Sequence, residues 1–147
     1  MDAKKIINME RRGIMDTKFT ERITNDPYAK FLGMTVDEIG EGFAKVSMNV
    51  TDNMMNIHGT ANGGVIFSLA DAAFAIASNT YDQQAVGINV NMNFIAAGFL
   101  NNRLIAVAKE VSKNTKLGFY NMEVRNEQDQ LIATAEGIVY RKKMKNT

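Results

Sequence analysis

The sequence has no cysteine and no tryptophan, and it has one proline and one histidine among its 147 residues. Without cysteine the chain forms no disulfide bond and offers no thiolate as a nucleophile or metal ligand. With a single histidine, His58, a histidine-rich metal site within one chain is excluded as well. We therefore expect a protein that works without a metal ion or another cofactor.

The chain also has little net charge and no long apolar run. Its formal net charge is +1, so no long-range field draws it to nucleic acid or to an anionic membrane. The longest apolar stretch, Val65–Ala77, is interrupted by Ser68 and Asp71, whereas a membrane span needs about 20 apolar residues. The first residues lack the apolar segment of a secretory signal. We expect a cytoplasmic protein with neither a nucleic-acid nor a membrane partner.

The length fits one domain with one sizeable core. Residues 1–15 are polar and mixed in charge, and we expect them to be disordered or an upstream extension. The run Glu10–Ile14 is encodable by a purine-rich stretch that resembles a bacterial ribosome-binding site, which suggests Met15 as the natural start. The predicted domain covers residues 16–143, and residues 144–147 form a tail.

Alternating apolar and polar residues predict a series of strands separated by turn residues. The predicted strands are Met34–Ile39, Phe43–Val50, Ile88–Phe94, Leu104–Val111, Lys116–Arg125 and Leu131–Arg141. The last four follow one another through short connections, which predicts an antiparallel meander. A short helix is predicted over Phe19–Lys30, interrupted near Asn25–Pro27 and stopped by Gly33.

The central segment predicts a long buried helix. The loop Asn56–Gly64 leads into Val65–Ala77, which is apolar almost all round, and such a helix is normally buried. An α+β fold, in which a curved antiparallel sheet of five to six strands wraps one long helix, buries both apolar surfaces.

Asp71 is the one carboxylate in this apolar helix. Ionised groups are rarely buried unless they are paired or functional. Ser68, Asp71, Ala75 and Ser78 are three or four positions apart and share one predicted helix face, a narrow polar slot through which a substrate reaches the carboxylate. The alternative is a structural Asp71 that bonds within the core or pairs with a strand lysine.

The start of the same helix predicts an oxyanion hole. Asn62 is a candidate N-cap, and Gly63 and Gly64 fill the first turn, where backbone N–H groups lack helical partners. The alternative is ordinary turn chemistry. Gly63 and Asp71 are eight residues apart, or about 12 Å along a helix. If both act on one carbonyl, the site therefore lies between two subunits related by a two-fold axis.

These residues carry a resemblance to a known family. The chain resembles the hotdog-fold acyl-CoA thioesterases of the phenylacetic-acid-degradation (PaaI-like) family. The matching residues are Asn56, Gly59, Asn62-Gly63-Gly64, Asp71 eight residues after Gly63, Ala72–Ala75, Asn91–Ile95, Gly118–Tyr120 and Leu131–Arg141. The resemblance extends over residues 18–141. One departure is Asn62, where many members have histidine, and it bears on rate and substrate more than on reaction class.

The resemblance implies a hotdog fold and thioester hydrolysis. Asp71 would be the nucleophile or the general base, the Gly63 N–H would polarise the thioester carbonyl, and Asn56 would position the water or the thioester. The candidate substrate-binding residues around them are Asn62, Gly64, Ser68 and Asn89. His58 is in a different register and is interpreted as an ordinary loop residue.

The ends of the substrate are less clearly marked. The polar turn Lys113-Asn114-Thr115-Lys116, or the basic Arg141–Lys143, could meet the nucleotide phosphates of CoA, but such segments are more often solvated charge. The residues that either line an acyl pocket or fill the core are Phe67, Phe74, Met54, Met55 and Met92.

We expect a homodimer, assembled further into a homotetramer, that hydrolyses an aryl-acetyl-, aromatic or medium-chain acyl-CoA to the free acid and CoA. The alternative function is a non-catalytic acyl-CoA-binding regulator or sensor of the same fold. A dehydratase is disfavoured because it needs a histidine with an acidic partner, and His58 is in the wrong register. An isolated binding or scaffold protein is a further alternative.

Overall fold

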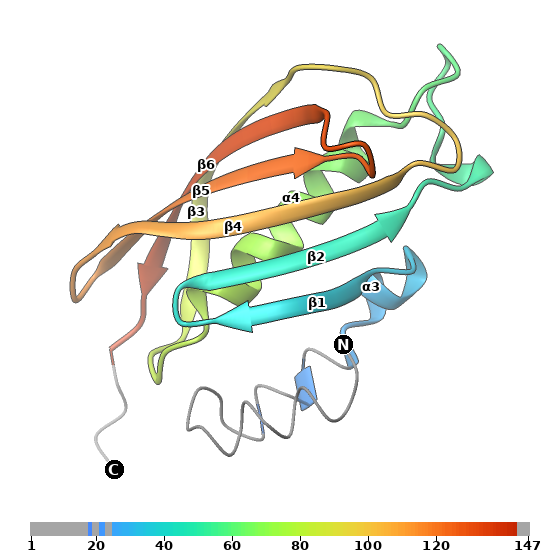
Figure 1. Ribbon diagram of the computed structural model, residues 1–147. Coiled ribbons are helices and arrows are strands. Elements are labelled where there is room, and N and C mark those ends of the chain that lie inside the picture. Colours follow the sequence, from blue (N-terminus) through green and yellow to red (C-terminus); the bar gives the residue numbers. More distant parts are fainter. Residues whose placement is uncertain (1–17, 19–20, 23–24, 144–147) are drawn as a thin grey trace.

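The computed structural model describes residue 18, residues 21–22 and residues 25–143 (Figure 1). The predictions for residues 1–15, for Met15 and for residues 144–147 therefore lie outside the described residues.

Within the predicted first helix the structure defines α3 (Pro27–Phe31). The Asp26 side chain caps it by accepting hydrogen bonds from the N–H groups of Tyr28 and Ala29, which explains the interruption predicted there. Gly33, with a φ of 70°, follows the helix and turns the chain away.

The described residues form one six-stranded antiparallel sheet and one long helix, as the sequence predicts. The strands are β1 (Thr35–Gly40), β2 (Phe43–Asn49), β3 (Ala85–Phe94), β4 (Arg103–Lys113), β5 (Leu117–Arg125) and β6 (Leu131–Arg141). A 3₁₀ turn, η1 (Asp52–Met54), and the helix α4 (Gly63–Ser78) lie between β2 and β3. This is the hotdog arrangement, with α4 lying across one face of the curved sheet (Figure 1).

The order of the strands corrects the predicted meander. The order is β1-β2-β4-β5-β6-β3, so β4, β5 and β6 form a meander but β3 pairs with β6 at the far edge of the sheet rather than with β4. The physical reason is that α4 carries the chain across the face of the sheet, and β3 therefore begins at the edge opposite β1. Residues 95–102 then return the chain so that β4 pairs with β2.

The core lies between α4 and the sheet. The helix buries Leu69, Ala73, Phe74 and Ala77 almost completely. The Phe74 ring meets Tyr120 of β5 edge-on, with 5.6 Å between the ring centroids, a favourable aromatic geometry. A Cβ atom on Gly137 would lie 2.7 Å from the Phe74 ring, so β6 needs glycine at that position.

The other face of α4 is open, which corrects the prediction that the helix is buried all round. Gly64, Phe67, Asp71 and Ala75 are exposed or only partly covered in the single chain. Ser78, which the spacing places on the face of Asp71, is instead buried and donates a hydrogen bond to the Ala75 carbonyl. An apolar residue suits a protein core and a subunit interface equally well, so composition alone does not separate the two faces.

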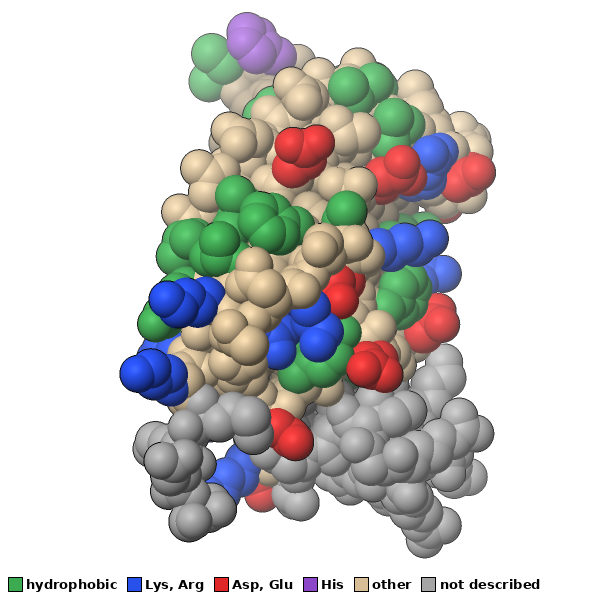
Figure 2. Space-filling model, turned by 90° about the vertical axis from the view of Figure 1, so that its left-hand side faces the viewer, with side chains coloured by type: hydrophobic (Ala, Val, Ile, Leu, Met, Phe, Trp, Pro, Cys, Tyr) green, Lys and Arg blue, Asp and Glu red, His purple; other side chains and the backbone are tan. Residues whose placement is uncertain are grey.

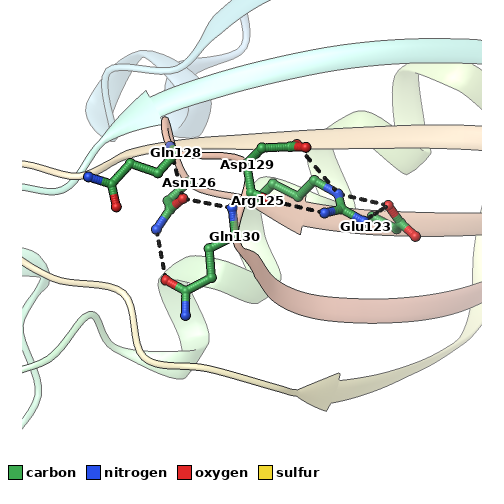
Figure 3. Close-up of polar contacts among 6 residues, drawn as sticks. All are labelled: Glu123, Arg125, Asn126, Gln128, Asp129 and Gln130. Atoms are coloured by element: carbon green, nitrogen blue, oxygen red, sulfur yellow. Dashed lines mark hydrogen bonds and ion pairs between the residues drawn. The ribbon is translucent and has the colours of Figure 1, made fainter.

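An asparagine closes the turn between β5 and β6 (Figure 3). The Asn126 Oδ1 accepts hydrogen bonds from the N–H groups of Gln128 and Gln130, both at 3.0 Å, and the Asn126 amide donates to the Gln130 Oε1. Asp129 has a φ of 62°, and Arg125 next to the turn bonds to Glu123 at 3.1 Å. The turn is thus built by one side chain acting on its own backbone.

Candidate active site

A second asparagine organises the loop that leads into α4. The Asn56 Oδ1 accepts hydrogen bonds from the N–H groups of His58 and Thr60, at 2.9 and 3.1 Å, and its amide donates to the Thr60 Oγ1. A bridge between Met55 and Ala61 closes the base of the loop. The side-chain oxygen of Asn56 therefore already has two donors, and among the described residues its amide has one N–H without a partner. His58 is exposed, and its backbone N–H donates to Asn56.

The N-terminus of α4 has one unpartnered N–H. The Asn62 Oδ1 caps the helix by accepting from the Gly64 N–H at 2.8 Å. The Asn62 carbonyl accepts from the N–H groups of Val65 and Ile66. The N–H of Gly63 has no hydrogen-bond partner in the described part of the chain. It is therefore the free donor at the positive end of the helix dipole.

Gly63 lines a groove of about 360 Å³. Asn56 and Gly63 both line it, together with Phe94 at the end of β3. A Cβ atom on Gly63 would lie 3.2 Å from the Phe94 Cζ, so the absence of a side chain keeps the approach to the N–H open. The structure thus brings two of the three predicted catalytic residues together.

Asp71 lies elsewhere on the chain, two turns along α4. No other residue in the described ranges makes a hydrogen bond or an ion pair with its carboxylate. The side chain is exposed, yet the surrounding protein withholds enough water to raise the pKa of Asp71 above its usual value. A raised pKa makes the carboxylate a stronger base. Its distance from Gly63, about 12 Å along the helix, keeps the two apart within one chain.

Ser68 is tied to a residue that the sequence did not indicate. The Ser68 Oγ donates to the Gly64 carbonyl at 2.7 Å, so it accepts from the hydroxyl of Tyr28 on α3 at 2.9 Å. Tyr28 and Ser68 are 40 positions apart, and no local pattern signals such a contact. Ser68 and Asp71 remain neighbours on the exposed side of α4.

Asn89 does not reach this groove in the single chain. It is exposed on β3 and accepts a hydrogen bond from Asn91 at 2.9 Å. Val90 and Met92, which alternate with these asparagines, pack against the core. Asn89 therefore points away from the sheet face that α4 covers.

The turn Lys113-Asn114-Thr115-Lys116 lies at the opposite end of α4. The Asn114 Oδ1 accepts from the N–H groups of Lys116 and Leu117. The Thr115 carbonyl accepts from Gln83, which follows the C-terminus of α4. A helix of 16 residues is about 24 Å long, so this turn and the Gly63 N–H of the same chain are far apart.

A tyrosine cluster holds that far end together. The Glu110 Oε2 accepts hydrogen bonds from the hydroxyls of Tyr81 and Tyr120, at 2.7 and 3.2 Å. Burial and the Glu110 charge raise the pKa of both tyrosines. The Lys113 Nζ lies 4.3 Å from the Tyr81 ring centroid, and the Arg141 guanidinium lies 5.1 Å from the same centroid. The cluster places both basic side chains against one aromatic ring, an arrangement that is favourable for cations.

The candidate acyl-pocket residues divide into two groups. Those that belong to the core or pack against it are Phe74, Met54 and the partly buried Met55 and Met92. Phe67 is 37% exposed. No group of three or more His, Asp or Glu side chains in the described ranges is placed to hold a metal ion, and no helix there is long and apolar enough to cross a membrane.

The edge strand β3 and the open face of α4 leave apolar surface uncovered. Val86, Ile88 and Phe94 of β3 are 38%, 58% and 58% exposed. Figure 2 shows a band of hydrophobic side chains across the side of the molecule that lies to the left in Figure 1. An exposed strand edge with apolar residues is a typical place for two chains to pair.

Comparison with known proteins agrees with this fold and shows the family of the chain. Residues 58–133 match the family described as the thioesterase superfamily. A putative esterase of Archaeoglobus fulgidus is 43% identical over 117 residues, which are 80% of this chain and 76% of the relative. The acyl-coenzyme A thioesterase PaaI of Escherichia coli is 38% identical over 80% of this chain and 84% of its own. The structure of the E. coli PaaI protein from the phenylacetic acid degradation operon superimposes with a TM-score of 0.83, at 36% identity, over 85% of this chain and 91% of that one.

Proposed function

The chain belongs to the thioesterase superfamily, and from that premise we propose that it hydrolyses an acyl-CoA to the free acid and CoA. The observation that carries the proposal is the N–H of Gly63, which has no hydrogen-bond partner in the described part of the chain and belongs to a residue that lines a groove together with Asn56. A relative of 38% identity is an acyl-CoA thioesterase by name. An unpaired carboxylate of raised pKa, Asp71, supplies the base or nucleophile.

The proposed reaction uses groups of the chain itself. The Gly63 N–H donates a hydrogen bond to the thioester oxygen and stabilises the negative charge that develops there. Asp71 either removes a proton from water, which attacks the carbonyl carbon, or attacks that carbon itself to give an anhydride that water then hydrolyses. In both routes the C–S bond breaks, CoA leaves as the thiolate and takes up a proton, and the acid is released.

The site is completed by a second chain. Because Gly63 and Asp71 are about 12 Å apart along α4, one chain does not place both at the same carbonyl. A two-fold axis perpendicular to α4 sets two helices antiparallel and brings Gly63 of one chain toward Asp71 of the other. The exposed apolar residues of α4 and β3 support such a homodimer, and we propose a homotetramer built from two of them.

The same symmetry gives the basic turn a role. The turn Lys113–Lys116 lies beyond the C-terminus of α4, so in an antiparallel pair it approaches the Gly63 end of the other chain. Lys113 and Lys116 would then meet the CoA phosphates, and Asn114 and Thr115 would shape the turn. Asn89 and Gly64 would lie beside the interface rather than touch the carbonyl.

Two asparagines support the thioester. Asn56 has one free amide N–H in the groove of Gly63, and we propose that it positions the thioester or the attacking water. Asn62 uses its side-chain oxygen as the helix cap, so we propose that its main role is to hold the first turn of α4, and with it the Gly63 N–H, in place.

The test is release of free CoA from phenylacetyl-, benzoyl- and medium-chain acyl-CoAs by the wild type and by Asp71→Asn. Asp129→Asn is the matched control, since it makes the same chemical change on the β5–β6 turn, where asparagine tolerates the positive φ. We expect turnover by the wild type and the control and its loss in folded, oligomeric Asp71→Asn. If acyl-CoA binds to every variant and none releases CoA, the protein is a sensor and the proposal is wrong.

A further inference from the structure

A second groove lies beside the N-terminus of α4. It measures about 760 Å³ and runs between α3, η1 and the first turns of α4. Its apolar walls come from Tyr28, Phe31, Met54, Met55 and Val65. Tyr28 and Phe31 are 55% and 76% exposed, and α3 buries none of its residues. Large aromatic surface that the chain leaves in water is suited to an apolar ligand.

The Tyr28 ring is held in place although it is exposed. Its hydroxyl donates to the Ser68 Oγ at 2.9 Å, and Ser68 in turn donates to the Gly64 carbonyl at 2.7 Å. The ring is thus tethered at its tip to the helix α4, one turn before Asp71, while the rest of the ring keeps exposed surface. A fixed aromatic wall binds a flat ligand with little loss of side-chain entropy.

Two grooves therefore flank one helix N-terminus. Gly63 lines the smaller groove, and Asn62 and Val65 line the larger one. A thioester carbonyl carries two substituents, the acyl group and the sulfur with its long unbranched arm, and they leave the carbonyl carbon in different directions. The smaller groove, about half the volume of the larger one and lined by small residues such as Ala61 and Ala97 as well as by Phe94, suits the narrow arm. The larger groove, walled by aromatic and methionine side chains, suits the acyl group.

We propose that the larger groove binds the acyl group and that Tyr28, positioned by Ser68, makes the enzyme favour aromatic acyl groups. This inference rests on the proposed acyl-CoA thioesterase function. Tyr28 determines specificity by stacking against the acyl ring, and Ser68 acts through Tyr28. Neither takes part in proton transfer.

The experiment compares two thioesters that differ only in the acyl group. The ratio of kcat/KM for phenylacetyl-CoA to kcat/KM for hexanoyl-CoA is measured for the wild type, Tyr28→Ala, Tyr28→Phe, Ser68→Ala and the double variant Tyr28→Phe/Ser68→Ala. Tyr140→Ala is the control, since Tyr140 is an exposed tyrosine on β6. A general loss of activity or stability cancels in the ratio, whereas a change in acyl recognition does not.

We expect Tyr28→Ala to lower the ratio about tenfold, mainly through KM of the aromatic substrate, in line with the loss of an aromatic stacking contact and its buried area. Tyr28→Phe keeps the ring but loses the tether, and Ser68→Ala loses the same tether from the other side. Each should lower the ratio about two- to threefold, and the double variant should lower it no further. Tyr140→Ala should leave the ratio unchanged.

The proposal is overturned if Tyr28→Ala lowers both kcat/KM values equally, because Tyr28 would then have only a structural role. If the wild type releases CoA from neither thioester, the proposed function has failed instead. The same ratio is then taken from dissociation constants measured by titration calorimetry. A ratio of dissociation constants that Tyr28→Ala leaves unchanged overturns the groove assignment in that case as well.

Discussion

Two loops of this protein are built by the same hydrogen bonds but lead into different kinds of segment. In the loop from Asn56 to Thr60 and in the turn from Asn126 to Gln130, an asparagine oxygen accepts the N–H groups of the second and fourth residues after it. In both, the asparagine N–H donates to the carbonyl four residues on, at 2.8 and 3.0 Å. The third residue after each asparagine has a positive φ, at Gly59 and Asp129.

The two loops differ in the segment into which each one leads. The Asn126 turn (Figure 3) leads into β6, whose backbone groups are paired in the sheet. The Asn56 loop leads into α4, whose first N–H has no partner in the described chain. The asparagine pattern is therefore a way to build a loop and is not by itself a catalytic signature. The loop becomes a candidate site because it ends at an unpaired donor beside a groove.

Asp71→Asn gives the largest effect on this comparison, because it removes the proposed base from the helix into which the Asn56 loop leads and changes nothing in the Asn126 turn. We expect kcat to fall about 10²- to 10⁴-fold, the usual contribution of a general base. CoA release under saturating substrate measures it, with the oligomeric state checked by light scattering. Activity within a few-fold of the wild type would exclude Asp71 from the chemistry.

Acid should inactivate the enzyme at a higher pH than an ordinary aspartate implies. Partial desolvation raises the pKa of Asp71. As the pH falls, the carboxylate is therefore protonated, and kcat/KM drops, at a higher pH than the usual pKa of an aspartate predicts. The charged form of Asp71, which activity requires, has the opposite effect on folding stability. Above the raised pKa the charged form costs folding free energy, so Asp71→Asn should be at least as stable as the wild type at neutral pH. That advantage should vanish as the pH falls below the ordinary aspartate pKa. The pH dependence of kcat/KM tests the first expectation. The urea midpoints of the wild type and of Asp71→Asn, measured across the same pH range, test the second.

Gly63→Ala tests the free donor next. The new Cβ atom would lie 3.2 Å from the Phe94 ring, so the ring must shift and the approach to the N–H narrows. We expect kcat/KM to fall about 10- to 100-fold, somewhat less than the loss of an oxyanion-hole donor. The double variant Gly63→Ala/Phe94→Ala should recover part of the loss. No recovery would show that contact with Phe94 is not the cause.

Asn56→Ala and Asn126→Ala form the most direct pair. Each removes three side-chain hydrogen bonds, so each should lower the free energy of unfolding by about 1–3 kcal/mol. Only Asn56→Ala should also lower kcat, because only Asn56 has its remaining amide N–H in the groove of Gly63. Urea denaturation and CoA release measure the two quantities. An equal loss of activity in both variants would mean that Asn56 acts through stability alone.

The positive-φ residues give the smallest effect. Gly59→Ala places a side chain in the left-handed region and should cost about 1 kcal/mol of stability. Asp129→Gly relieves the same strain in the other turn and should be neutral to stabilising by a few tenths of a kcal/mol, since its contact with Arg125 is exposed. Thermal unfolding distinguishes the two signs. Neither change should alter KM.

Much of the fold was predictable from local pattern. The alternation in Phe43–Val50 and Leu131–Arg141 predicted β2 and β6 to within one residue at each end, and the Asn62 cap with two glycines predicted the start of α4. The position of β3 was not predictable in this way, because a strand that follows a long helix can join either edge of a sheet. The meander prediction was wrong for that reason.

The site was predictable in part. Gly63 and Asn56 are close in sequence, and the structure places them in one groove. The contact between Tyr28 and Ser68 spans 40 residues, and nothing in the local sequence indicates it. The exposure of Asp71 was not foreseen, since the apolar residues around it suit a core and a subunit interface equally.

The sequence by itself determined the residue chemistry: no thiolate, a single histidine, one carboxylate in an apolar helix, and a capped helix start. These depend on residue identity and on spacing within one element, which short-range geometry sets. Only the tertiary structure decided which edge β3 occupies, which face of α4 stays open, and that two grooves flank Gly63. These depend on how distant segments pack, and packing free energy comes from surfaces that the chain brings together only when it is folded.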